Sequence, residues 1–78
     1  MSTESYQNLL NNKANAMDKF ADMVVNTTGC NVDTAYKVYN LYMKAKLMKT
    51  DAIHGTYHVK HGAYLEAGAL NNAVAQVA

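Results

Sequence analysis

Three histidines lie close together in the sequence and are the first residues to consider for metal chemistry: His54, His58 and His61. On a helix, His54 and His58 would share one face and could bind a divalent metal. Gly55, Gly62 and the β-prone stretch between them disfavour a helix, and on a strand His54 and His58 would lie more than about 12 Å apart unless the chain turns back. Zinc-finger cysteine spacing and an HExxH motif are both absent. We therefore expect no metal and no cofactor, and histidines that are solvated or cap the backbone.

The single cysteine, Cys30, is the other residue with reactive chemistry, and it lies between Gly29 and Asn31. A nucleophilic thiol needs a nearby base, and the histidines are far away in the sequence. A lone cysteine at a helix junction is usually a small buried hydrophobe. The sequence also contains no GxSxG motif and no glycine-rich phosphate loop. We expect no enzymatic activity, and one cysteine indicates a reducing compartment without an intramolecular disulfide.

Most of the positive charge lies in residues 31–64, where five lysines and two aspartates give a local net charge of +3. Tyrosines interleave with these lysines. Such a surface can contact phosphates and stack on bases, and it also suits a protein interface, because tyrosine is enriched at binding hot spots. The candidate partner-binding residues are Lys44, Lys46, Lys49, Tyr57, His58, Lys60, His61 and Tyr64.

The first element expected to support these residues is a long amphipathic helix over residues 3–26. Its apolar face recurs at spacings of three and four, and Gly29 can take the left-handed conformation that ends a helix. If Phe20 faces the core, its truncation should be strongly destabilising. The residues of this face are Tyr6, Leu9, Leu10, Lys13, Met17, Phe20, Met23 and Val24.

A second helix is predicted over residues 32–49, with Asn31 as its N-cap and Asp33 near its positive end. Its apolar stripe is wider than one core-facing side requires. The short connection to the first helix predicts an antiparallel helical hairpin.

The segment that follows is less regular. Residues 51–61 are expected to form a short β-hairpin or an irregular segment, with His54 and Gly55 at the turn. Residues 64–77 return to helical spacing and predict a C-terminal helix. The fold class is therefore mainly α, with residues 1–78 as a single domain.

Size and composition favour association with another molecule. The chain has 78 residues, of which 50% are apolar and 17% charged. A chain below about 80 residues rarely has stability to spare, and this one has more apolar surface than a thin bundle can bury. We expect self-association as a dimer or higher oligomer, or a face that binds a partner. No apolar run is long enough to cross a membrane, and no secretory signal is visible at the N-terminus.

The C-terminal half, with a lysine-rich helix over residues 35–47 and the stretch Val59-Lys60-His61-Gly62-Ala63 before a final helix, resembles short uncharacterised bacteriophage accessory proteins. That resemblance implies a protein made in the host bacterial cytoplasm that binds a host or phage macromolecule. It carries over no functional residue.

These observations predict a small non-enzymatic binding protein, an accessory or inhibitor protein that acts by binding a host or phage protein. The alternative is a small nucleic-acid-binding module that uses the lysine and tyrosine surface. The chain has no arginine, the residue that most often reads guanine. Its isoelectric point, about 7.9, is also below that of a typical nucleic-acid-binding domain.

Overall fold

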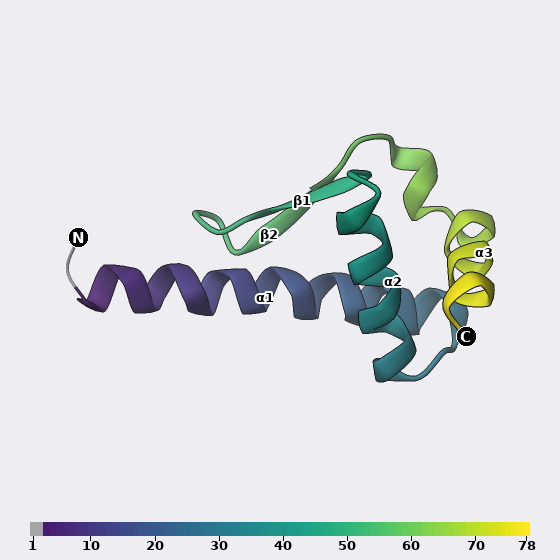
Figure 1. Cartoon of the computed structure of the whole chain (residues 1–78), viewed down its shortest axis with the longest axis horizontal. Helices are drawn as coiled ribbons and strands as arrows, with labels where there is room; N and C mark the ends of the chain where they lie inside the picture. Colours follow the sequence, from purple (N-terminus) through teal and green to yellow (C-terminus); the bar gives the residue numbers. More distant parts are fainter. Residues whose placement is uncertain (1–2) are drawn as a thin grey trace.

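A computed structural model describes the backbone of residues 3–78 and the side chains of residues 10–78. The fold is mainly α with a β-hairpin between the second and third α-helices (Figure 1), as the sequence predicts. Tyr6 and Leu9 of the predicted apolar face lie outside the residues whose side chains are described. The elements are α1 (Thr3–Thr28), α2 (Val32–Lys44), β1 (Met48–Asp51), β2 (Thr56–Val59), a 3₁₀ helix (Gly62–Leu65) and α3 (Ala67–Val77).

The turn between α1 and α2 follows the predicted chemistry. Gly29 adopts a φ of +75°, which L-residues with a side chain rarely take, and its N–H donates to the Val25 carbonyl at 2.8 Å. The Thr28 hydroxyl donates to the Val24 carbonyl at 2.8 Å, so α1 reaches Thr28 instead of ending at Asn26. The Asn31 side chain caps α2 by accepting the Thr34 N–H at 2.8 Å.

The predicted end of the second helix, at residue 49, is wrong: α2 ends at Lys44. Lys46 has a φ of +59°. The Lys46 N–H donates to the Met43 carbonyl at 3.1 Å, and the Leu47 N–H donates to the Tyr42 carbonyl at 3.0 Å. These two bonds form the Schellman motif, in which the left-handed position is usually glycine. Because a lysine holds that position, the sequence carries no visible stop signal.

The two long helices pack against each other, but α2 crosses α1 at a steep angle instead of running back along it (Figure 1). The antiparallel course expected from the short connection is therefore not followed. α3 packs on both helices. The hairpin extends from the C-terminal end of α2 and lies over α1, toward the N-terminal end of α1. The N-terminal part of α1 extends beyond α2, which contributes to a radius of gyration of 13.1 Å, against about 11.5 Å for a compact chain of this length.

The hairpin forms as predicted, with its first strand starting earlier, at Met48. The strands are antiparallel, and Lys49 lies opposite His58. Gly55 has a φ of +64° at the turn, and a side chain added there would meet Asn12 of α1 at 3.5 Å. The hairpin turn therefore packs closely against α1.

The core is built around Phe20, which is fully buried. Its ring contacts those of Tyr39, Tyr42 and Tyr57, with centroid distances of 6.1, 5.4 and 5.3 Å. These rings come from α2 and β2, so one side chain of α1 joins three elements. This placement confirms that Phe20 faces the core.

None of the helices in residues 3–78 combines the length and the apolar composition needed to cross a lipid bilayer.

Candidate functional site

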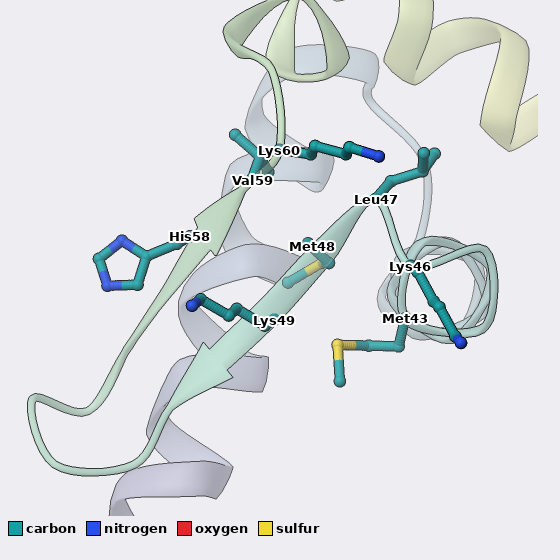
Figure 2. A pocket seen from close by; sticks show the side chains of 8 residues that line it. All are labelled: Met43, Lys46, Leu47, Met48, Lys49, His58, Val59 and Lys60. Atoms are coloured by element: carbon teal, nitrogen blue, oxygen red, sulfur yellow. The ribbon is translucent and has the colours of Figure 1, made fainter.

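A surface groove of about 310 Å³ lies where the end of α2 meets the hairpin (Figure 2). Met43 reaches from α2 toward β1, and Lys60 extends from the end of β2 toward Leu47. The lining combines apolar side chains with three lysines and one histidine, and it contains no acid. We call this site the basic groove; it is lined by Met43, Lys46, Leu47, Met48, Lys49, His58, Val59 and Lys60.

The positive charges of the basic groove are not neutralised by neighbouring carboxylates. In residues 10–78, the ion-pair contacts within 4.0 Å are those of Asp51 with His54 and His58. No lysine of this part of the chain has such a contact. The lysine ammonium groups therefore remain available to a negatively charged partner.

Four of the eight candidate binding residues from the sequence come together in the basic groove: Lys46, Lys49, His58 and Lys60. Lys44 is exposed at the last position of α2, outside the groove. His61 is exposed just before the 3₁₀ helix and lies beside Tyr64, with ring centroids 5.8 Å apart.

The two candidate tyrosines are half-buried and pack against neighbouring aromatic rings. The Tyr57 ring meets Phe20 edge-on at an interplanar angle of 89°, and burial raises the pKa of its hydroxyl. The Tyr64 ring packs against Tyr42, whose hydroxyl donates to the Tyr64 carbonyl at 2.7 Å. These contacts stabilise the hairpin and the 3₁₀ helix against the helices.

The apolar floor of the groove was not among the candidate residues. In the sequence, Met43, Leu47 and Met48 belong to the wide apolar stripe of the longer predicted helix, and Val59 belongs to the β-prone stretch. The sequence feature that indicates these residues is the apolar stripe of the second predicted helix, which is wider than one core-facing side requires. Because α2 ends at Lys44, Leu47 and Met48 lie at the junction between α2 and the hairpin instead of on the face of a helix.

The conformation of Lys46 is the most unusual backbone feature of the groove. It is the one non-glycine residue with positive φ in residues 3–78. The left-handed conformation costs a residue with a side chain about 1–2 kcal/mol. Backbone strain of this kind concentrates at functional sites, and here it falls on a lysine that lines the groove.

A lysine-to-glycine change at this position tests the strain. We expect Lys46→Gly to raise the free energy of unfolding by about 0.5–1 kcal/mol, because glycine adopts positive φ without steric cost. Urea denaturation followed by circular dichroism measures the change. Lys37→Gly, at an exposed position in the interior of α2, is the control and should lower stability by a similar amount. Equal destabilisation by both variants would contradict the strain at Lys46.

Asp51 organises the hairpin turn beside the groove. One carboxylate oxygen accepts the N–H groups of Ile53 and His54 at 3.1 and 3.2 Å. The other lies 2.7 Å from His54 Nδ1 and 3.1 Å from His58 Nε2. Hydrogen bonds from the two histidine rings hold the pKa of the Asp51 carboxyl well below its usual range. The chain does turn back here, which brings His54 and His58 to one carboxylate.

This contact gives a pH-dependent contribution to stability. A lowered carboxyl pKa stabilises the folded state above the unfolded value, about pH 4, and the contribution is lost as the pH falls further. We expect Asp51→Asn to be less stable than the parent chain at neutral pH and to lose less stability below about pH 4. Urea midpoints measured across this range test the expectation, and superimposable pH profiles would refute it.

No other group in the described residues offers a stronger site. Within residues 10–78, no three histidine, cysteine, aspartate or glutamate side chains are arranged to hold a metal ion. Cys30 is half-buried and packs against the core cluster. The chain matches no protein-family model, no curated protein and no solved structure.

Proposed function

We propose that this chain is a small non-enzymatic binding protein that holds an acidic segment of a partner protein in the basic groove. The observation that carries the proposal is a groove lined by three lysines and four apolar side chains, with no acid in the lining. Apolar contacts supply the area that excludes water, and the lysines supply steering and orientation. The positive φ of Lys46 adds support, because strained backbone positions concentrate at functional sites.

The nucleic-acid alternative has less aromatic surface for base stacking than the tyrosine content of the sequence suggests. Tyr39 and Tyr42 are 7% and 3% exposed, and Tyr57 packs on Phe20. The Tyr36 hydroxyl donates to Asp18 at 2.8 Å, which ties α2 to α1. Bases stack on free aromatic faces, so the positions of these tyrosines favour a protein partner.

Fluorescence anisotropy with three labelled probes tests the proposal. The probes are a peptide of alternating glutamate and leucine, the same peptide with glutamine replacing glutamate, and single-stranded DNA. We expect binding of the acidic peptide at micromolar concentration and at least tenfold weaker binding of the glutamine peptide, as loss of charge-assisted contacts implies. Tight DNA binding that falls steeply with salt would instead support the nucleic-acid module. Failure of the acidic peptide to bind would reject the proposal.

A binding role of this kind agrees with the accessory or inhibitor function that the phage resemblance implies. In that setting the chain acts in the host bacterial cytoplasm. It would occlude or recruit a host or phage protein that presents an acidic surface.

Self-association is part of the proposal and has its own candidate surface. Leu10, Ala14 and Met17 of α1 line a surface groove together with Lys13 and with Tyr39 of α2, and Leu10 is 45% exposed. We expect a dimer at tens of micromolar in sedimentation velocity, and Leu10→Glu should dissociate it by burying a charge. Asn11→Glu on an exposed neighbouring position is the control. Sedimentation of the parent chain solely as an 8.6 kDa species would contradict self-association.

A further inference from the structure

The hairpin leaves one strand edge without a backbone partner beside the basic groove. The Leu47 carbonyl accepts the Lys60 N–H at 2.7 Å, and Lys49 lies opposite His58. In an antiparallel pair, alternate residues direct both backbone groups toward the partner strand. Leu47, Lys49 and Asp51 therefore face β2, and the N–H and C=O groups of Met48 and Thr50 face the opposite side.

That opposite side is the outer edge of β1. No backbone hydrogen bond from another element described here reaches Met48 or Thr50. Figure 2 shows β1 between β2 and α2, with Met43 directed toward its outer side. An edge whose backbone groups have no partner is a template for an added strand.

The charge beside this edge indicates what that strand carries. Lys49 points to the face of the hairpin away from the core, because Met48 and Thr50 alternate with it and Met48 is buried. Lys46 lies just before β1, and His58 is the cross-strand neighbour of Lys49. Opposite charges on directly facing strand positions stabilise a sheet. An added strand is therefore favoured if its residues on the Lys49 face are acidic.

We propose that an extended acidic segment of a partner protein binds as a third, antiparallel strand on the outer edge of β1. This inference rests on the proposed function and specifies the conformation in which the partner segment binds. Acidic residues face Lys49, and the intervening apolar residues lie opposite Met48 and Thr50. The apolar residues exchange backbone hydrogen bonds with those two positions, as in other cases of strand addition. An amphipathic helix in the groove would leave the edge unpaired.

Backbone methylation of the glutamate–leucine peptide separates these two modes. Methyl groups on the leucine nitrogens remove the donors that face β1, whereas methyl groups on the glutamate nitrogens leave those donors intact and serve as the matched control. We expect the first peptide to bind at least about tenfold more weakly than the second. Hydrogen exchange of the Met48 and Thr50 amides in the intact chain should slow by about tenfold or more on binding the unmodified peptide, whereas the already paired Lys49 amide should change less.

The outcomes distinguish this inference from the proposed function. Equal binding of both methylated peptides, with unchanged exchange at Met48 and Thr50, would overturn strand addition and leave the acidic-partner proposal standing. Absence of binding by every acidic peptide would overturn both. Slower exchange at Met48 and Thr50, together with weak binding of the leucine-methylated peptide alone, would support strand addition.

Discussion

Phe20→Ala is expected to lower the free energy of unfolding by about 3–5 kcal/mol. Phe20 is fully buried and contacts three tyrosine rings from α2 and β2. Its removal leaves a cavity at the point where α1, α2 and the hairpin meet, and it also removes favourable ring contacts. A domain of this size has only a few kcal/mol of stability, so the variant should be largely unfolded or close to its midpoint in water.

Urea or thermal denaturation followed by circular dichroism measures this effect. Lys19→Ala is the matched control, because Lys19 neighbours Phe20 on α1 but is exposed; its effect should stay within about 0.5 kcal/mol. A Phe20→Ala variant as stable as this control would mean that α1 presents a different face to the core. The account of the fold would then fail.

Reversing two charges of the basic groove is expected to have the largest effect on binding. In Lys49→Glu/Lys60→Glu, two attractive contacts with an acidic segment become repulsive. We expect a loss of affinity for the glutamate–leucine peptide of about 100-fold or more, which corresponds to about 2.7 kcal/mol. Both side chains are exposed, so the fold should tolerate the change.

The control for this variant is Lys19→Glu/Lys37→Glu, which changes the net charge by the same amount at exposed positions outside the groove. Long-range attraction alone would make the two double variants bind equally weakly, and added salt would remove the difference from the parent chain. Binding that depends on the groove weakens in the first variant far more than in the second. Anisotropy at low and physiological salt compares them, with circular dichroism to confirm folding.

Much of the fold was predictable because local signals agree with the tertiary structure. Gly29 and Asn31 place a helix end and a helix start on either side of Cys30, and both take the expected roles. Gly55 marks the hairpin turn for the same reason. The end of α2 could not be predicted, because its left-handed residue is Lys46 and lysine is otherwise compatible with a continuing helix. That one position also determines where Met48 lies.

The candidate site was predictable in its charge and less so in its shape. The lysine-rich segment identified Lys46, Lys49 and Lys60, because charge follows directly from residue type. The apolar floor depends on where α2 ends, which the sequence does not reveal. Tyr57 was interpreted as a surface anchor, but tyrosine serves both cores and interfaces. Only the packing of Tyr57 on Phe20 distinguishes the two roles.

The most direct measurement of the central claim is an NMR titration of the isotope-labelled chain with the unlabelled glutamate–leucine peptide, using its glutamine counterpart as the control. Saturable amide shifts are predicted at the end of α2 and along β1 and β2, centred on Lys46, Lys49 and Lys60, with much smaller changes from the glutamine peptide. Shifts of equal size from both peptides, or shifts centred on a different part of the molecule, would contradict an acidic partner in the basic groove.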